Sequence, residues 1–130
     1  MFKKIIEMFK KTPVFKRILV FENYEKLEDI FKCELEKHFV VKEADSHINF
    51  KEIKKFKPHL IILSYNTNFD GVEFLNKIKK LRIKFKTIFR TFYDDENIIN
   101  YISNHCKIPK ERILNQDLSG PEFCKILRKI

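Results

Sequence analysis

The feature that most constrains this chain is an apolar run of strand length at Leu60–Leu63. It lies in the segment Lys57-Pro-His-Leu-Ile-Ile-Leu-Ser64. Consecutive large aliphatic residues do not alternate with polar ones, so both faces of this strand should be covered, as in a parallel sheet with crossover helices on either side. Ligands and chemistry collect at the carboxyl ends of such strands, which makes Ser64 the first candidate site residue.

The rest of the chain alternates between strand and helix patterns. Further strands are expected at Arg17–Glu22, Phe39–Ala44, Lys86–Thr91 and Arg112–Asn115. Helices are expected at Asn23–His38, Asn49–Lys55, Gly71–Leu81, Asp94–Asn104 and Ser119–Ile130, with a polar loop over Tyr65–Asp70. Repeated strand and helix units of this length predict a doubly wound α/β sheet.

Size and cysteine usage indicate the class of protein. A chain of 130 residues forms one domain of ordinary size. Cys33, Cys106 and Cys124 are an odd number without a CxxC pair, which fits a reduced, intracellular protein. No segment resembles a signal peptide or a membrane span. We therefore expect a soluble, cytoplasmic protein.

The charge is high but mixed. The chain has 27 basic and 18 acidic residues, for a net charge of +9. Interspersed signs are typical of a solvated surface and argue against a nucleic-acid partner. Gly71 and Gly120 are the only glycines, so a glycine-rich phosphate loop cannot be built.

Residues 1–16 read as a basic amphipathic helix and linker that precede the domain over 17–130. The apolar residues of this segment recur at helical spacing, with lysines opposite, and are Phe2, Ile5, Ile6 and Phe9. The helix should end near Pro13. A helix this short should become ordered by docking, either onto its own domain, onto a partner or second protomer, or onto an anionic membrane surface.

Several segments in the right order resemble the receiver domain of two-component response regulators. They are Arg17-Ile-Leu-Val-Phe-Glu-Asn23, Lys57-Pro-His-Leu-Ile-Ile-Leu-Ser64, Phe69-Asp-Gly-Val-Glu-Phe-Leu75 and Thr87-Ile-Phe-Arg-Thr91. The resemblance implies a flavodoxin-like, five-stranded parallel sheet of order 2-1-3-4-5, here with an extra N-terminal helix.

The resemblance also identifies a degenerate pocket. Receivers use a carboxylate nucleophile, two acids that hold Mg²⁺, a hydroxyl and a lysine, and these positions fall on Ser64, Glu22, Asn23, Thr91 and Asn115, or on Gln116 for the last. A serine hydroxyl without activation cannot form the acyl phosphate, and one of the two metal-binding charges is missing. We therefore expect no cofactor and no bound metal, with Glu22 as a weak candidate ligand.

These residues predict a stand-alone, phosphorylation-independent, receiver-like signalling module that is not an enzyme and acts by protein contact. No output domain is expected after the closing helix. The alternative is an atypical response regulator that is phosphorylated or binds metal by an unusual route, with Glu22 and Asp70 as the nearby acids.

The expected contact surface is the face that receivers commonly use, formed by the fourth helix, the fifth strand and the fifth helix. It carries Tyr101, Arg112, Lys125 and Arg128, a mixture that suits dimerisation or a protein partner. Arg112 also occupies the position of the family's aromatic switch residue. A plain solvated surface is the alternative. The acids Asp94-Asp95-Glu96 read as the start of a helix rather than as a metal cluster.

Overall fold

The computed structural model describes residues 17–21, 29–44, 47–66, 69–91, 95–115 and 120–129, without the side chains of 29–32, 66, 69, 115 and 120. The predicted N-terminal helix with Phe2, Ile5, Ile6 and Phe9 lies outside these residues. Among the described residues, no helix is long and apolar enough to cross a bilayer.

Five parallel strands form the sheet. They are β1 (Arg17–Phe21), β2 (Val40–Ala44), β3 (Leu60–Asn66), β5 (Lys86–Thr91) and β6 (Ile113–Asn115), in the order β2-β1-β3-β5-β6. Ile18 is paired with Leu60, and Leu60 in turn with Lys86. Numbered as parallel strands alone, this order is 2-1-3-4-5, which confirms the predicted flavodoxin-like fold with the apolar run at its centre.

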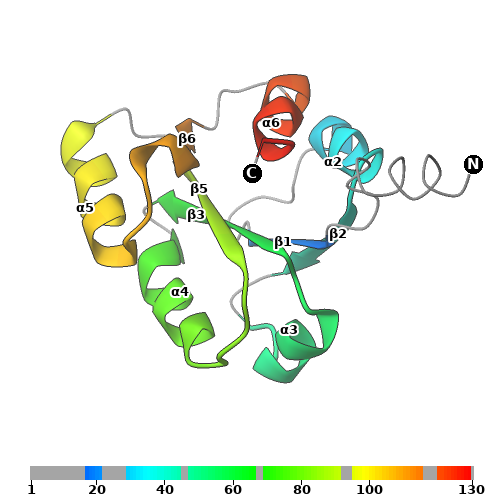
Figure 1. Cartoon of the computed structure of the whole chain (residues 1–130), viewed down its shortest axis with the longest axis horizontal. Helices are drawn as coiled ribbons and strands as arrows, with labels where there is room; N and C mark the ends of the chain where they lie inside the picture. The colour runs from blue at the N-terminus through cyan, green and yellow to red at the C-terminus, as the bar shows by residue number, and fades with distance from the viewer. Residues whose placement is uncertain are drawn as a thin grey trace, which may run out of the picture.

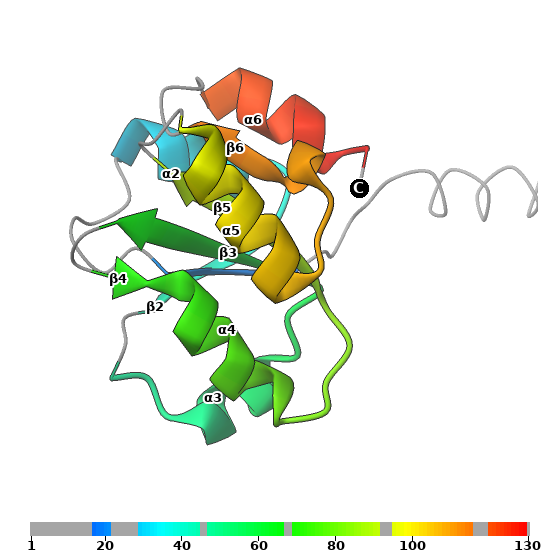
Figure 2. The ribbon, with the colours of Figure 1, turned by 90° about the vertical axis from the view of Figure 1, so that its left-hand side faces the viewer.

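Helices cover both faces of the sheet (Figures 1 and 2). α2 (Asp29–Glu36) and α6 (Gly120–Leu127) lie on one face, and α3 (Phe50–Phe56), α4 (Gly71–Lys79) and α5 (Glu96–Cys106) lie on the other. Each face has its own apolar core. Ile61 and Leu63 belong to the core under α3, α4 and α5, whereas Leu60 and Ile62 belong to the core under α2 and α6. The central strand is therefore buried on both sides, as its uninterrupted apolar run predicts.

Helix starts are fixed by side chains that bind backbone N–H groups. Asn49, Asp70 and Asp95 cap α3, α4 and α5, each accepting hydrogen bonds from the first turn of its helix. This confirms the interpretation of the acids around Asp95 as the start of a helix. Because the helices run antiparallel to the strands, all of these caps lie at the carboxyl end of the sheet.

One predicted loop is wrong. The segment Tyr65–Asp70 does not form a polar loop throughout, because β3 continues to Asn66 and a short strand β4 (Phe69–Asp70) pairs antiparallel with it. Tyr65 packs against the core under α3, α4 and α5. This tertiary contact extends the strand through residues whose polarity favours a loop.

Smaller boundary differences concern residues close to element ends. Arg112 does not begin a strand; it ends the 3-10 turn Lys110–Arg112 that precedes β6. The helix from Gly71 ends at Lys79, and Leu81 packs on the core from the turn beyond it. The described part of the helix predicted at Asn23–His38 begins at Asp29, and residues 23–28 lie outside what the structure describes.

Candidate functional site at the carboxyl end of the sheet

Ser64 lies near the carboxyl end of the central strand and is only 1% exposed. Alternation along β3 places its side chain with Leu60 and Ile62, on the face covered by α2 and α6. Its Oγ has no hydrogen-bond partner among the described residues. A serine hydroxyl becomes a nucleophile only when a base or a lowered pKa activates it. No described group bonds to Ser64 in that way.

Arg90 is the neighbour of Ser64 on β5 and was not among the candidate site residues predicted from the sequence. The two residues are register partners, and Arg90 is only 8% exposed. Its guanidinium carbon lies 5.5 Å from the ring centroid of Phe123 on α6, on the same sheet face as Ser64. Its Nε makes no hydrogen bond among the described residues, although the side chain has other interactions. A single charged residue inside the buried strand Thr87-Ile-Phe-Arg-Thr91 is the signal that would have identified it.

Thr91 faces away from this pair. It is 2% exposed, and its hydroxyl donates to the backbone oxygen of Tyr65 at 3.3 Å. Side chains alternate between the two faces along β5, which puts Thr91 on the same face as Phe89, under α4 and α5. The side chains of Ser64 and Arg90 project from the opposite face. The two candidate hydroxyls are thus close along the sheet edge but point into different layers.

The remaining candidates of the predicted pocket are only partly described. The backbone of Asn115 is the register partner of Thr91, so it reaches the same edge of the sheet. The side chain of Asn115, and residues Glu22, Asn23 and Gln116, lie outside what the structure describes. Within the described residues, no three His, Cys, Asp or Glu side chains gather as a metal site.

Gly71 and Asp70 define how closely α4 approaches Ser64. A Cβ on Gly71 would collide with the backbone oxygen of Ser64 and would lie 2.9 Å from Cε1 of Phe89. Asp70 accepts from the backbone N–H groups of Val72 at 3.0 Å and Glu73 at 3.1 Å. The carboxylate that the sequence offered as a nearby acid therefore serves as a helix cap.

The cysteines differ in exposure. All are free thiols; Cys33 is exposed, whereas Cys106 and Cys124 are buried. Burial raises the pKa of the Cys106 and Cys124 thiols above the ordinary value, which lowers their reactivity as thiolates.

The predicted contact residues are distributed around edge strand β6. Tyr101 on α5 lies with its ring centroid 4.2 Å from that of His105 and 5.8 Å from that of Tyr65. Arg128, just after α6, has its Nη2 2.6 Å from Nε2 of His38. Because α5 and α6 cover opposite faces of the sheet, Tyr101 and Arg128 are on different sides of edge strand β6, while Arg112 is half-buried and Lys125 exposed.

Comparisons with known proteins support the fold. No protein-family model matches the chain, and no curated protein matches it in sequence. Among solved structures, it is similar to the signal receiver domain of the response regulator NarL from Mycobacterium tuberculosis, with a TM-score of 0.71, 16% identity, and coverage of 90% of this chain and 96% of that one.

Two further structures give the same result. A response regulator from Thermotoga maritima matches with a TM-score of 0.70 and 15% identity, and the BeF3-activated receiver domain of DrrB with a TM-score of 0.66 and 13% identity. Each comparison covers 88% of this chain and 96% of the other. The chain therefore has the receiver fold.

Proposed function

We propose that this chain is a receiver-like signalling module that acts by contact with a protein partner, without accepting a phosphoryl group from a histidine kinase. The proposal rests mainly on Ser64. It stands at the position that resembles the acceptor aspartate, it is buried, and no described group activates its hydroxyl.

Arg90 supports the same proposal through its charge. The guanidinium belongs to the residue paired with Ser64, in a part of the fold where the resemblance implies a divalent cation. The guanidinium adds positive charge where the family carries acids, and it has no lone pair with which to coordinate a metal ion. The apolar core of the fold is retained while the pocket residues are changed, which fits a domain that acts through its contact surface.

Incubation of the full chain with acetyl phosphate and Mg²⁺, followed by intact-mass measurement, tests the proposal. We expect no phosphate adduct, while a competent receiver domain in a parallel reaction acquires one. An adduct that is lost in alkaline hydroxylamine would be an acyl phosphate and would overturn the proposal. An adduct that resists hydroxylamine and disappears in Ser64→Ala would instead be a serine ester, which is the unusual route of the alternative.

We propose the exposed side of the Tyr65, Tyr101 and His105 ring cluster as the contact surface. Rings that already pack against one another have few rotamers to lose, so they bind a partner at low cost in side-chain entropy. In sedimentation velocity over a range of concentrations, the full chain should self-associate, and Tyr101→Ala should weaken this association. Asn104→Ala, an exposed change on the same helix, is the matched control. A strict monomer would rule out self-association at this surface.

A further inference from the structure

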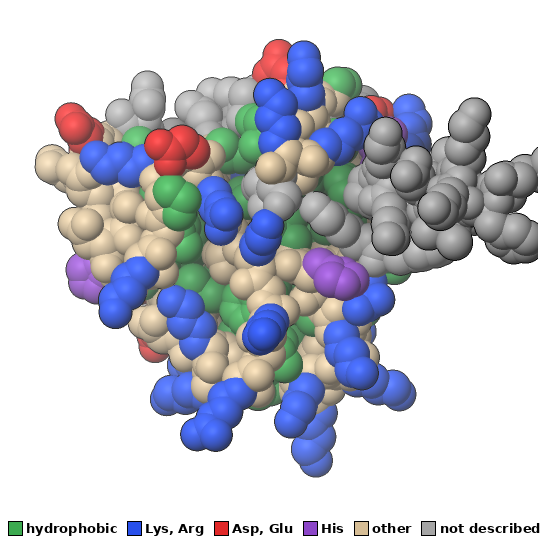
Figure 3. All heavy atoms as spheres, viewed as in Figure 1, with side chains coloured by type: hydrophobic (Ala, Val, Ile, Leu, Met, Phe, Trp, Pro, Cys, Tyr) green, Lys and Arg blue, Asp and Glu red, His purple; other side chains and the backbone are tan. Residues whose placement is uncertain are grey.

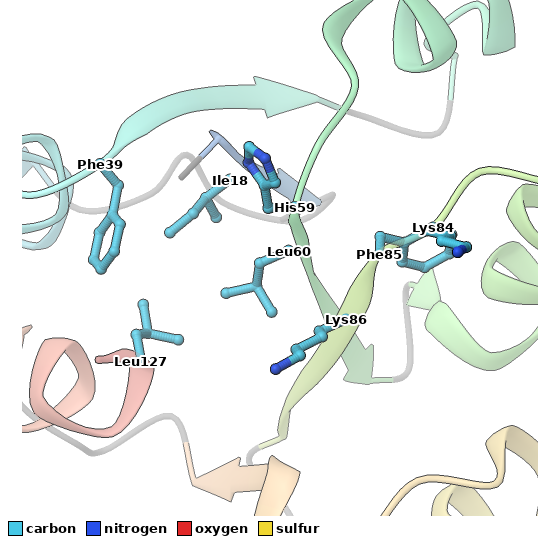
Figure 4. Close-up of a pocket in the computed structure, with 8 residues that line it drawn as sticks. All are labelled: Ile18, Phe39, His59, Leu60, Lys84, Phe85, Lys86 and Leu127. Atoms are coloured by element: carbon cyan, nitrogen blue, oxygen red, sulfur yellow. The ribbon is translucent and has the colours of Figure 1, made fainter. Parts of the chain in front are cut away.

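An apolar hollow lies at the amino end of the sheet, opposite the predicted pocket. Its volume is about 350 Å³, within the size range of small-molecule sites. Figure 4 shows Ile18, Phe39, Leu60 and Leu127 around one space, contributed by two strands, the turn after α2 and the end of α6. Phe85 also lines the hollow, and within the described part of the lining the polar side chains are those of Lys84, Lys86 and His59.

A second hollow adjoins the first and has a different character. It also measures about 350 Å³ and shares His59 and Lys84 with its neighbour. Its other described lining residues are the cationic Arg17, Lys54 and Lys57 and the apolar Pro58 and Ile83. Among the described residues that line either hollow, none is acidic. A non-polar space therefore opens directly beside a cationic one.

Hydrogen bonds hold two of these polar groups in place. The backbone N–H of Arg17 donates to Nδ1 of His59 at 3.0 Å, and Nε of Arg17 donates to the backbone oxygen of Lys57 at 2.9 Å. An Nδ1 that accepts a hydrogen bond leaves the ring proton on Nε2. The guanidinium of Arg17 keeps its terminal nitrogens as donors to a ligand.

The surface around the two hollows is also positively charged. In the view of Figure 3, lysine and arginine side chains cover the lower half of the molecule, over α3 and α4, and the acidic side chains in view lie mainly along the upper margin. Last-turn lysines contribute to this region, including Lys54 and Lys55 of α3 and Lys77 and Lys79 of α4. The electrostatic potential at this end of the sheet favours an anion.

We infer that the two hollows together bind an anionic amphiphile, with an alkyl chain in the apolar hollow and a carboxylate or phosphate head beside Arg17, Lys57 and Lys84. Charge complementarity selects this occupant. The chain's own N-terminal segment is also amphipathic, but its lysines would oppose the basic rim. The site is independent of the proposed signalling role.

Titration of the full chain with monomeric dodecanoate, followed by methyl NMR, tests the inference. The methyl resonances of Ile18, Leu60 and Leu127 should shift saturably. The double variant Lys57→Glu/Lys84→Glu should weaken binding by about tenfold, because two favourable contacts become repulsive. Lys51→Glu, an exposed charge reversal on α3 outside both hollows, should leave the affinity unchanged.

Ligands without a negative head provide the strictest control. Dodecanol and dodecyltrimethylammonium should bind much more weakly than dodecanoate. Equal shifts with all three compounds, or no shift of these methyl groups with dodecanoate, would overturn the inference. So would a response that occurs only after residues 1–12 are removed, because the chain's own segment would then be the occupant.

Vesicles distinguish the source of the amphiphile. Co-sedimentation with phosphatidylglycerol vesicles but not with phosphatidylcholine vesicles, lost in the double variant, would identify a bilayer lipid. Saturable dodecanoate binding without vesicle binding would identify a free acyl chain.

Discussion

At the carboxyl end of the sheet, Gly71 occupies a position that has no positive φ, and a side chain is excluded there only because Ser64 and Phe89 are too close. At the amino end the situation is reversed. Lys57, Arg82 and Lys107 have φ angles of 51°, 56° and 54°, in the left-handed region that favours glycine. There the backbone is strained but open to solvent, whereas at Gly71 it is relaxed but crowded.

The two ends of the sheet also differ in charge. Helix starts, with first-turn acids Glu52, Glu73, Glu96 and Glu122, lie at the carboxyl end. Helix ends lie at the amino end, where positive side chains complement the helix dipole. The amino end thereby becomes the basic one. At Lys57 and Lys107 the backbone N–H donates to a carbonyl of the last helical turn, that of Ile53 and Ser103 respectively, which offsets part of the left-handed penalty.

The largest effect is expected from crowding at the carboxyl end. Gly71→Val should lower the free energy of unfolding by about 3 kcal/mol, because α4 must move away from β3 to admit the side chain. Urea denaturation measures the change. Asn76→Val, an exposed change on the same helix, should cost well below half of that. Equal losses in the two variants would show that close packing at Gly71 is not the cause.

Loss of a cap should come next. Asp70→Ala removes an acceptor of two backbone N–H groups and should destabilise the protein by about 1–2 kcal/mol. Asp95→Ala removes one bond, to the N–H of Asn97 at 2.8 Å, and should cost about 1 kcal/mol or less. Thermal unfolding of both variants at the same pH compares them. If Asp70→Ala leaves the stability unchanged, the Asp70 carboxylate is not needed as a cap and becomes a candidate site residue again.

Ser64→Ala should raise the stability of the protein, in contrast to the changes at Gly71 and Asp70. Removal of a buried hydroxyl without a hydrogen-bond partner should stabilise the fold by about 1 kcal/mol. Ser103→Ala is the matched control, since that hydroxyl donates to the backbone oxygen of Ile108 at 2.7 Å and its loss should destabilise by about 1 kcal/mol. Destabilisation by Ser64→Ala would mean that the hydroxyl is bonded in solution.

The smallest effects are expected from backbone strain at the amino end. Lys57→Gly and Lys107→Gly should each stabilise by about 0.5 kcal/mol, since relief of the left-handed penalty slightly exceeds the added entropy of the unfolded chain. Lys80→Gly, at a helix end with φ of −67°, should destabilise by a similar amount. If all three changes destabilise, strain at the positive-φ sites is not significant.

The glycine variants of Lys57 and Lys107 also distinguish an effect on stability from an effect on ligand binding. Lys57 lines the cationic hollow and Lys107 does not. Both glycine variants should therefore be slightly more stable, but only Lys57→Gly should bind dodecanoate less tightly, by about threefold. A matched loss in Lys107→Gly would place the amphiphile elsewhere.

Most of the fold was predictable because local patterns and burial agree along the chain. The apolar run at Leu60–Leu63 predicted a strand buried on both faces, and its place at the centre of the sheet followed. The cap at Asp95 followed from helix electrostatics. The strand through Tyr65 was not predictable, because a ring that packs across to α5 overrides the polarity of its neighbours.

The candidate site was predictable only as positions along the chain. The sequence by itself determined that a serine, rather than a carboxylate, follows the central apolar run, and that glycine is too rare for a phosphate loop. Only the tertiary structure decided that Arg90 lies beside Ser64, that Thr91 points into the other layer, and that Gly71 is excluded from bearing a side chain. The identity of each side chain and the spacing of apolar residues are local properties of the chain. The register of the strands and the distance between the helices and the sheet are set by contacts between segments far apart in the chain.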